Sequence, residues 1–506
     1  MRISDLTAGM DILTSQGDMT IDVSDICYDS GRCTGGSLFV AVPGLRYDGH
    51  DFIDDAVRRG AVCVVHERDR APLQGVTSIR VRDCRRAMGW LGKRFFGNPS
   101  GELCLIGITG TNGKTTVSYL LESILGEAGH ATGVIGTINY RYGGQVLPAL
   151  NTTPESVDLH RVLRDMADAG VTHVVMEVSS HAIDLNRVDD CDFDMGIFTN
   201  LTSEHLDYHG SMENYFAVKR RFIEELIPPG KQVINGDDPW GMRIIETVGS
   251  QAVVFSLERT ADVSVAASSL SMQGIWAGIR GSGAAFDVAS SMIGRFNLAN
   301  ILTAATAALS LGISGGHIAD GIEKVRTIPG RLERVTGPGE PVVFVDYAHT
   351  EDALKRALEN LAAFREGKII TVFGCGGDRD RTKRAPMGRV ATELSDIAII
   401  TSDNPRTEDP LAIIDDIMAG ITDGAVERYD ARRLYENRNG RGYTVMPDRR
   451  EAIELALSMA VPSDIVLIAG KGHEDYQILG SRRVSFDDRV VTREALARRK
   501  AEEGEP

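Results

Sequence analysis

The segment from Leu103 to Thr116, LCLIGITGTNGKTT, constrains the fold more than any other part of the chain. Its apolar first half has the length and composition of a buried parallel strand. A glycine-rich turn and a Lys-Thr-Thr sequence follow, and apolar residues then recur at helical spacing from Val117 to Ala128. This order predicts a phosphate-binding loop, in which backbone N–H groups and a helix N-terminus hold phosphate oxygens.

The loop is a variant of the general pattern G-x-x-x-x-G-K-[ST], because Ile108 stands where the pattern has its first glycine. A glycine-rich turn without a ligand is the alternative interpretation. In a nucleotide site, Lys114 would reach the β- and γ-phosphates, and Thr115 or Thr116 would offer a hydroxyl to Mg²⁺. We predict a nucleoside triphosphate site formed by Gly110, Thr111, Asn112, Gly113, Lys114, Thr115 and Thr116.

Length and charge restrict the class of protein. A chain of 506 residues is long enough for about three domains. The formal net charge of −16 argues against a nucleic-acid partner. Seven cysteines without C-x-x-C spacing indicate reduced thiols, and no apolar run reaches membrane-spanning length. We therefore expect a cytoplasmic protein without membrane insertion.

Alternating strand-like and helix-like segments predict an α/β protein with three domains. We expect an N-terminal α/β domain at 1–100, a central parallel-sheet domain with the phosphate loop at 101–332, and a C-terminal Rossmann-like domain at 333–506. Within the central domain, Val253–Ser290 is rich in small residues and β-formers and predicts an antiparallel flap.

Polar residues follow several predicted strands, where parallel sheets bind their ligands. Glu177 and His205 each come directly after a strand of the central domain and are candidate Mg²⁺ ligands. In the C-terminal domain, Arg379 and Arg406 lie in such loops, and each can pair bidentately with a carboxylate. Taken singly, Glu177 or His205 could instead make only a local hydrogen bond. Arg379 or Arg406 could instead be a solvated loop residue without a ligand.

Ten short motifs occur along the chain, each once. They are GTNGKTT (Gly110–Thr116), NTTPE (Asn151–Glu155), MEVSSHA (Met176–Ala182), TNLTSEHLDYHGSMENY (Thr199–Tyr215), GRFNLAN (Gly294–Asn300), PGRLE (Pro329–Glu333), DYAHT (Asp346–Thr350), FGCGGDRD (Phe373–Asp380), DNPRTEDP (Asp403–Pro410) and AGKGHEDYQ (Ala469–Gln477).

These motifs resemble those of the Mur ligases, the enzymes that build the peptidoglycan stem peptide. Within the family, the chain is similar to the members that add the third residue to UDP-N-acetylmuramoyl-L-alanyl-D-glutamate. The resemblance implies a first domain that binds the uridine diphosphate and a dipeptide contact set in the central domain. The implied residues for this substrate are Ser30, Leu45, Arg46, Tyr47, Asn151, Thr152, Thr153, Ser179 and Arg187.

The resemblance also implies a catalytic centre. Lys219 matches a lysine that the family carries as a carbamate (N6-carboxylysine), which would join Thr115, Glu177 and His205 around Mg²⁺. Asn297 matches a position near the adenine of ATP, and Arg331 and Asp346 match the hinge that meets ATP. The implied catalytic residues are Lys114, Glu177, His205, Lys219, Arg331, Asp346 and His349, with His349 or a carboxylate as the base.

The amino-acid pocket implied by the resemblance consists of Arg379, Asp403, Asn404, Pro405, Arg406, Gly470 and Glu474. The sequence DNPR resembles the members that add meso-2,6-diaminopimelate, whereas lysine-adding members lack this arginine. The second carboxylate of diaminopimelate can pair with Arg406, while lysine would leave the guanidinium unpaired. The resemblance thus implies an ATP-dependent ligase, acting through an acyl phosphate and expected to be a monomer.

Three alternatives stay open. The chain could be a lysine-adding ligase of the same family, or a ligase resembling folylpolyglutamate synthase. From another class, it could be an ATP-driven binding module, although carboxylate-binding loops in the third domain would then have no purpose.

Overall fold

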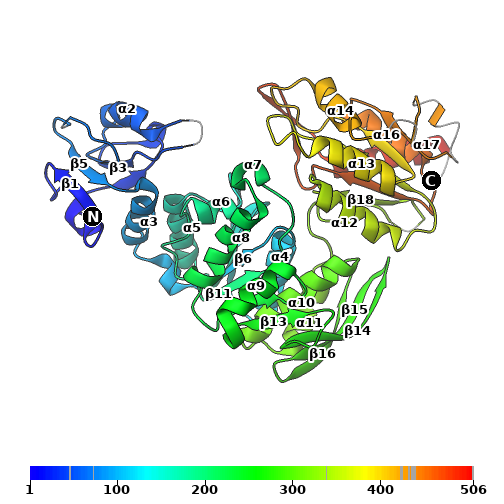
Figure 1. The fold of residues 1–506 in the computed structure, drawn as a ribbon, viewed down its shortest axis with the longest axis horizontal. Helices are drawn as coiled ribbons and strands as arrows, with labels where there is room; N and C mark the ends of the chain where they lie inside the picture. The colour runs from blue at the N-terminus through cyan, green and yellow to red at the C-terminus, as the bar shows by residue number, and fades with distance from the viewer. Residues whose placement is uncertain are drawn as a thin grey trace. The chain divides into compact units, whose positions relative to one another are not determined.

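The computed structural model describes residues 1–44, 47–71, 73–337, 339–421, 426–430, 433–434 and 440–503. They form three α/β domains built on three main sheets, as the sequence predicts (Figure 1). By contacts, the chain divides into two compact units. Unit 1 comprises Met1–Leu201, Ser211–Ser264 and Leu302–Gly321, and unit 2 comprises Thr202–Gly210, Val265–Ile301 and Ile322–Pro506.

The N-terminal domain is a five-stranded sheet in the order β1-β5-β4-β3-β2. The strands are parallel except β1, which pairs antiparallel with β5. Along β4, Cys63 and Val65 pack in one hydrophobic cluster and Val64 packs in another, and all three are buried. Both faces of the sheet are therefore covered. The elements are α1 (Ile3–Thr7), β1 (Ile12–Gln16), β2 (Asp25–Cys27), β3 (Ser37–Val40), α2 (Ile53–Arg58), β4 (Cys63–His66), β5 (Thr77–Val81) and α3 (Cys84–Phe95).

The central sheet places β6, the strand before the phosphate loop, between β11 and β10. The parallel strands run in the order β13-β12-β11-β6-β10-β7, and the antiparallel pair β8 and β9 extends the sheet beyond β7. The strands are β6 (Cys104–Thr109), β7 (Thr132–Ile135), β8 (Asn139–Tyr142), β9 (Gln145–Pro148), β10 (His173–Glu177), β11 (Met195–Phe198), β12 (Gln232–Asn235) and β13 (Val253–Ser256).

Helices alternate with most of the parallel strands of this sheet, and the last two helices of the central domain follow its final strand. The helices are α4 (Lys114–Glu127), α5 (Ser156–Asp168), α6 (Ser180–Asp184), α7 (Leu206–His209), α8 (Met212–Arg221), α9 (Pro239–Val248), α10 (Arg295–Ser310) and α11 (Gly315–Lys324). In the described part of the chain, no helix combines the length and apolar character that a bilayer crossing requires.

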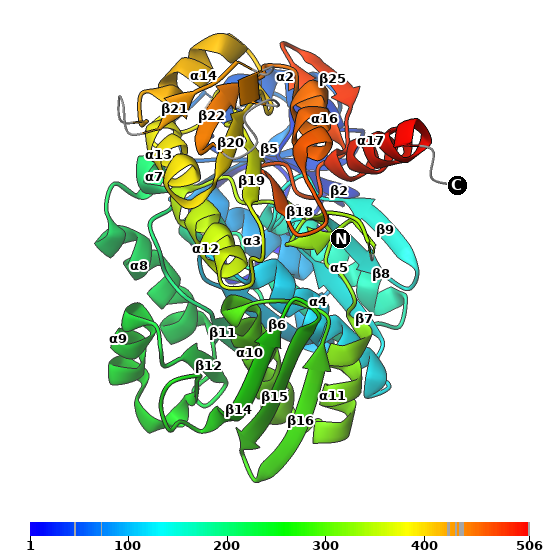
Figure 2. The same ribbon diagram turned by 90° about the vertical axis from the view of Figure 1, so that its right-hand side faces the viewer.

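The predicted antiparallel flap at Val253–Ser290 is wrong in its first part. β13 pairs parallel with β12, and the start of β14 (Val263–Ser271) pairs parallel with β13. For β13 the cause is α9, which lies between β12 and β13 and carries the chain back so that β13 enters in the same direction as β12. Antiparallel pairing is seen between β15 (Gly274–Gly281) and β16 (Ala284–Ser290), which form a hairpin (Figure 2).

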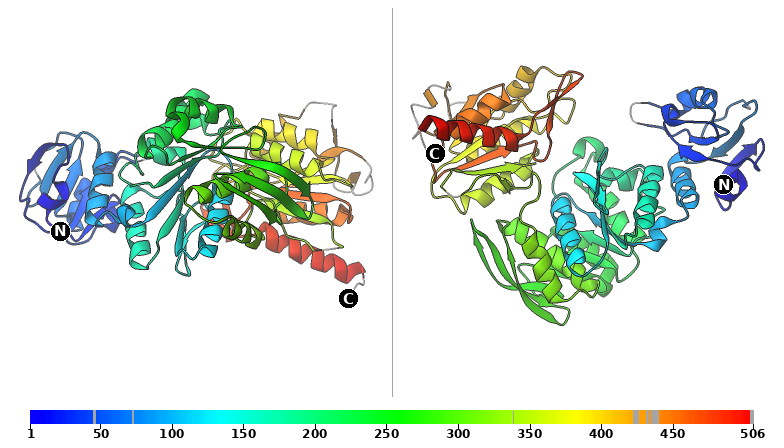
Figure 3. Two further views of the ribbon diagram at one scale, coloured as in Figure 1. Left: turned by 90° about the horizontal axis from the view of Figure 1, so that it is seen from below. Right: turned by 180° about the vertical axis from the view of Figure 1, so that it is seen from behind.

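The C-terminal domain is a seven-stranded sheet in the order β17-β18-β23-β19-β20-β22-β21, with β17 the antiparallel edge strand. Buried valine and isoleucine fill its central strands on both faces. Helix α17 follows the sheet and ends beside the C-terminus mark in Figure 3. The elements are β17 (Glu333–Arg334), β18 (Val342–Asp346), α12 (Glu351–Ala362), β19 (Ile369–Phe373), α13 (Arg384–Leu394), β20 (Ile397–Ile400), α14 (Pro410–Met418), β21 (Glu427–Arg428), β22 (Gly442–Val445), α16 (Arg449–Met459), β23 (Ile465–Ala469), β24 (Tyr476–Leu479), β25 (Arg482–Ser485) and α17 (Asp488–Glu503).

The first two domains meet where α3 lies beside α5 (Figure 1). His160 of α5 is fully buried there, and a Cβ at Gly92 of α3 would lie 3.1 Å from its ring. Neither ring nitrogen of His160 has a hydrogen-bond partner. Burial lowers the pKa of His160 to about 4, so the ring is neutral at physiological pH.

We expect this histidine to make the protein sensitive to acid. The unfolded chain binds a proton near pH 6.5 and the folded chain only near pH 4, so stability is lost as pH falls through that window. The loss approaches about 3 kcal/mol. His160→Leu should flatten the dependence of the unfolding midpoint on pH between 6.5 and 4, measured by urea denaturation.

His317→Leu, a substitution of an exposed histidine, is the control. Burial raises the pKa of Asp190 to about 6, which acts with the opposite sign, so the difference between wild type and His160→Leu isolates the histidine. Equal pH dependence in the two proteins would contradict the expectation.

Candidate active site

The predicted phosphate loop forms between β6 and α4. Gly110 has φ 145° and Gly113 has φ 90°, conformations that other residues rarely adopt. A Cβ at Gly110 would lie 1.9 Å from Thr199 Oγ1, so the loop is pressed against the residues that follow β11. The backbone N–H of Asn112 donates to Asn200 Oδ1 at 2.9 Å, which fixes the turn from the same side.

Two lysines converge on one carbonyl of this loop. Lys114 Nζ donates to Gly110 O at 2.8 Å and to Thr111 O at 2.9 Å. Lys219 of α8 is 1% exposed, and its Nζ donates to the same Gly110 O at 2.9 Å. Tyr215, one turn earlier on α8, lies beneath this amine with its ring centre 5.0 Å away. The structure thus brings Lys219 into the loop, although its sequence context alone is that of an ordinary helix lysine.

Glu177, the last residue of β10, is the buried anion of the site, with 1% exposure. Thr115 Oγ1 donates to its Oε2 at 2.9 Å. The hydroxyl of Thr137 donates to Oε2 at 3.0 Å and its backbone N–H to Oε1 at 3.0 Å. The hydroxyl and carboxylate oxygens of Thr115 and Glu177 are the ligand type that Mg²⁺ prefers, alongside waters and phosphate.

Among the described residues, no three His, Cys, Asp or Glu side chains cluster in the manner of an all-protein metal cage. A magnesium ion bound mainly through phosphate oxygens, waters and one or two protein ligands does not need such a cage. The Thr115 and Glu177 oxygens therefore fit the predicted cation.

The predicted dipeptide residues lie beside Glu177 in unit 1. Thr153 Oγ1 donates to Glu177 O at 2.8 Å, and Ser179 N donates to Thr153 Oγ1 at 3.1 Å. Thr152 Oγ1 lies 3.1 Å from Thr137 Oγ1, and Asn151 O accepts from Tyr140 at 2.5 Å. Thr152, Thr153 and Ser179 are thus linked to Thr137 and Glu177, and through Glu177 to Thr115 of the phosphate loop.

Arg187 fixes the same segment through its guanidinium. Its Nη1 donates to Thr153 O at 3.0 Å, and it pairs with Glu155 at 2.7 Å. Arg85 of the N-terminal domain also pairs with Glu155, at 3.4 Å. The N-terminal domain and the dipeptide segment are therefore linked by one carboxylate between two arginines.

The predicted uridine contacts are resolved only in part. Ser30 is buried at the start of a 3₁₀ turn, Ser30–Arg32, whose preceding Asp29 accepts from Gly31 N at 2.9 Å. Tyr47 is 75% exposed. Leu45 and Arg46 lie outside the described residues.

In unit 2, Asp346 and His349 follow β18. Leu332 N donates to Asp346 at 2.6 Å and Ala348 N at 2.8 Å, while burial raises the pKa of this carboxyl. His349 Nδ1 lies 2.8 Å from Tyr347 O, so this nitrogen carries the hydrogen and Nε2 keeps its lone pair. Burial lowers the pKa of His349 to about 4, with help from the Lys383 ammonium.

The remaining predicted ATP and metal residues of unit 2 occupy separate positions. Arg331 lies over the Tyr347 ring, 4.8 Å from its centre. Asn297 on α10 is buried and donates to Ile293 O at 2.9 Å. His205 has φ 56° and lies 3.8 Å from Glu204, which is also 3.9 Å from His349 Nε2.

The predicted amino-acid pocket forms at the carboxyl ends of β19, β20 and β23. Arg406 has φ 52°, and its Nη1 donates to Gly377 O at 2.7 Å, which draws the loops after β19 and β20 together. Asn404 Nδ2 donates to Glu474 Oε2 at 2.8 Å and joins the loop after β23. A Cβ at Gly470 would lie 2.8 Å from Asp403 Oδ2. Pro405 is buried between Asn404 and Arg406, whereas Arg379 is exposed.

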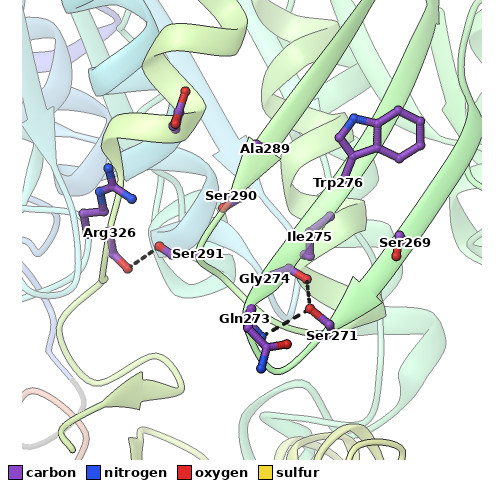
Figure 4. A pocket seen from close by; sticks show the side chains of 11 residues that line it. Ser269, Ser271, Gln273, Gly274, Ile275, Trp276, Ala289, Ser290, Ser291 and Arg326 are labelled. Atoms are coloured by element: carbon purple, nitrogen blue, oxygen red, sulfur yellow. Dashed lines mark hydrogen bonds between the residues drawn. The ribbon is translucent and has the colours of Figure 1, made fainter. Parts of the chain in front are cut away.

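A separate pocket of about 340 Å³ lies along β14, β15 and β16 (Figure 4). Its polar groups serve local turns: Ser271 Oγ donates to Gly274 O at 3.3 Å and accepts from Gln273 N at 3.2 Å. Ser291 Oγ donates to Arg326 O at 2.8 Å. None of the predicted site residues lines it.

Several residues that support the site were missed by sequence reasoning. Thr137 is an isolated polar residue in a loop, and only its hydrogen bonds to Glu177 identify it. Asn200 lies in the motif Thr199–Tyr215, just after β11, and its side-chain oxygen accepts from Asn112 N. Tyr215 is the last residue of the same motif and was not assigned a role; its hydroxyl lies 3.2 Å from Thr111 Oγ1. Lys471 lies inside a motif of the sequence but was not assigned a role.

The parallel sheet, phosphate loop and buried acid define an α/β protein of the nucleoside triphosphate-binding class. Residues 22–96 match the family model described as Mur ligase family, catalytic domain, residues 108–308 the Mur ligase middle domain, and residues 330–472 the Mur ligase glutamate ligase domain. The chain therefore belongs to the Mur ligase family.

Individual relatives agree with this assignment. A Geobacter sulfurreducens protein named UDP-N-acetylmuramoyl-L-alanyl-D-glutamate–2,6-diaminopimelate ligase is 46% identical, covering 97% of each chain. A solved structure of a ligase with the same name is 30% identical, with a TM-score of 0.68 and 99% of each chain covered. The Mycobacterium tuberculosis folylpolyglutamate synthase shares the fold at 19% identity, with a TM-score of 0.61 over 76% of this chain and 92% of its own.

We expect the position of Glu177 to depend on the small residue opposite it. A Cβ at Gly136 would lie 2.3 Å from Glu177 Oε1, a distance that forces the carboxylate to move. Gly136→Ala should weaken Mg-ATP binding about tenfold or more, measured by isothermal titration calorimetry.

Gly126→Ala is the matched control, because a Cβ there meets nothing within 4 Å. It lies in α4, where alanine favours the helix. Unchanged Mg-ATP affinity in Gly136→Ala would contradict the importance of this carboxylate position.

Proposed function

We propose that this chain is the ATP-dependent ligase that joins meso-2,6-diaminopimelate to the D-glutamate γ-carboxylate of UDP-N-acetylmuramoyl-L-alanyl-D-glutamate. Its cellular role would be peptidoglycan synthesis in the cytoplasm, as a monomer. The observation that supports the proposal is the joining of three loops at one sheet edge, where Arg406 donates to Gly377 O and the neighbouring Asn404 donates to Glu474, so that one set of loops supplies a guanidinium and a carboxylate. Such a pair suits a substrate end that bears both a carboxylate and an ammonium.

The nucleotide would bind at Gly110–Thr116, and Asn297 and Arg331 are the further residues that the family resemblance assigns to ATP. Lys114 would neutralise charge on the β- and γ-phosphates, because its ammonium is already held on the inner side of the turn. Thr115 and Glu177 would hold Mg²⁺, and His205 is a further candidate ligand. The cation would supply charge neutralisation on the phosphates during phosphoryl transfer.

We also propose that Lys219 is carbamylated in the active enzyme. As ammonium groups, Lys114 and Lys219 donate to the same carbonyl oxygen, which places two like charges close together in a buried setting. Reaction of Lys219 with CO₂ would replace one cation by an anion and remove this repulsion. The product, N6-carboxylysine, would also provide oxygens that suit Mg²⁺.

The reaction would proceed in two steps. The D-glutamate γ-carboxylate would attack the γ-phosphate of ATP, forming an acyl phosphate and releasing ADP. Thr152, Thr153, Ser179 and Arg187 would place the dipeptide, and Ser30 with Leu45, Arg46 and Tyr47 would hold the uridine end. The diaminopimelate amine would then attack the acyl carbon, and phosphate would leave from the tetrahedral intermediate.

His349 is the proposed base for the second step. Its Nε2 keeps a lone pair because Nδ1 donates to Tyr347 O. With a pKa lowered to about 4 it is a weak base, so it would take the amine proton as the new C–N bond makes that proton acidic. Asp346, whose oxygens accept two backbone N–H groups, would keep the loop that carries His349 in place.

The amino-acid selectivity gives the first test. Wild-type enzyme with UDP-N-acetylmuramoyl-L-alanyl-D-glutamate and ATP should release phosphate with meso-diaminopimelate and only slowly with L-lysine. Arg406→Ala should raise the KM for diaminopimelate about 100-fold and leave the KM for ATP unchanged, because it removes a carboxylate partner.

Arg389→Ala, which removes a half-exposed arginine paired with Glu351, is the control. Preference for L-lysine would retain the ligase but overturn the diaminopimelate assignment. Phosphate release that requires neither amino acid would favour an ATP-driven module.

The pKa of His349 gives a second test. Because its pKa is about 4, the imidazole is neutral throughout pH 6 to 8, and kcat should show no titration near pH 6.5 from this residue. His349→Gln should lower kcat 10²- to 10⁴-fold without changing the KM for ATP, in steady-state phosphate release across pH 5 to 9.

His317→Gln, at an exposed histidine, is the matched control. An acidic limb near pH 6.5 that disappears in His349→Gln would contradict the lowered pKa. An unchanged kcat would remove His349 as the base.

A further inference from the structure

Lys471 is a fully buried lysine at the edge of the proposed amino-acid pocket, with 0% exposure. It follows β23 and lies in the same short turn as Glu474, whose N–H donates to Lys471 O at 3.0 Å. The Tyr476 ring lies beside its ammonium, with the ring centre 5.4 Å from Nζ. Burying an ammonium is costly unless it is paired with an acid, so the partners of Lys471 indicate what it does.

The partners of Lys471 are polar groups of the pocket itself. Its Nζ lies 3.0 Å from Glu474 Oε2, 3.5 Å from Asn404 Oδ1 and 3.7 Å from Asp403 Oδ1. The ammonium thus separates two carboxylates that come from different loops, the loop after β20 and the loop after β23. Without it, two anions would face each other with little solvent between them.

Both side-chain bonds to Glu474 end on the same oxygen. Asn404 Nδ2 donates to Oε2 at 2.8 Å, and Lys471 donates to Oε2 at 3.0 Å. Within the ranges that the structure describes, no hydrogen bond reaches Oε1. The amide of Asn404 cannot turn over, because its Oδ1 accepts from Ile478 N at 2.9 Å. The Glu474 carboxylate is therefore held in one orientation with one oxygen left for a ligand.

We propose that Lys471 is a positioning residue that engages one oxygen of Glu474 so that the other receives the second ammonium of the amino-acid substrate. This inference rests on the proposed function, in which the distal end of diaminopimelate binds between Arg406 and Glu474. Lys471 itself does not touch the substrate. It makes the site select amino acids that carry the second ammonium over those that carry only the second carboxylate.

The test compares two amino acids of the same length. meso-Diaminopimelate has two carboxylates and two amines, whereas 2-aminopimelate has the same two carboxylates but lacks the distal amine. We expect wild type to prefer diaminopimelate in kcat/KM. Lys471→Met should lower kcat/KM at least tenfold for diaminopimelate and no more than twofold for 2-aminopimelate, with the KM for ATP unchanged.

Two further variants identify the route of the effect. Glu474→Gln should cause the same selective loss, and the double variant Lys471→Met/Glu474→Gln should lose no more than either single variant, because Lys471 acts through Glu474. Lys355→Met removes an exposed lysine of the same domain by the same substitution. It should leave kcat/KM unchanged for both diaminopimelate and 2-aminopimelate.

Two results for Lys471→Met would overturn the inference. An equal loss of kcat/KM for both amino acids would show that Lys471 only stabilises the domain. An unchanged ratio of kcat/KM between the two amino acids would show that Lys471 does not position Glu474. Additive losses in the double variant would also overturn it. If Lys471→Met lacks a native melting transition, Lys471→Gln, which keeps an N–H donor without the charge, should give a smaller loss of the same selectivity. Failure of wild type to use diaminopimelate would overturn the proposed function itself.

Discussion

The buried carboxylate of Glu177 is the interaction on which the central domain depends. It ends β10, receives the Thr115 hydroxyl from the helix of the phosphate loop, and receives both the hydroxyl and the N–H of Thr137. Its backbone carbonyl accepts from Thr153 in the predicted dipeptide segment. One residue therefore joins the phosphate loop, the proposed cation position and the predicted dipeptide segment, and displacement of this acid would disturb all three.

In the C-terminal domain, polar and charged side chains likewise hold several loops together. Four of its loops follow the parallel strands β18, β19, β20 and β23, and topology alone brings their polar residues to one edge. Backbone and side-chain hydrogen bonds then fix the loops to one another, with Arg406 reaching Gly377 and Asn404 reaching Glu474. A buried ammonium at Lys471 compensates the acids there, so the pocket keeps two carboxylates without an unpaired buried charge.

Much of this arrangement was predictable from sequence because the parallel strands are continuous apolar runs. The strand before the phosphate loop and the helix after it form as predicted, as β6 and α4, Glu177 lies at the end of β10, and Arg406 lies in the loop after β20. The parallel start of β14 was not predictable, since its run of small residues carries no information about parallel or antiparallel pairing. Lys219 and Lys471 could not be distinguished from surface lysines either, because burial and hydrogen-bond partners are properties of tertiary packing rather than of local pattern.

The central claim, that ATP activates the D-glutamate γ-carboxylate before the amine attacks, can be measured directly by isotope transfer. UDP-N-acetylmuramoyl-L-alanyl-D-glutamate labelled with ¹⁸O in that carboxylate would be incubated with ATP and meso-diaminopimelate, and the released phosphate analysed by mass spectrometry. Transfer of one ¹⁸O atom into each phosphate formed is the result expected for an acyl phosphate. Phosphate without ¹⁸O, released alongside the ligated product, would contradict this account.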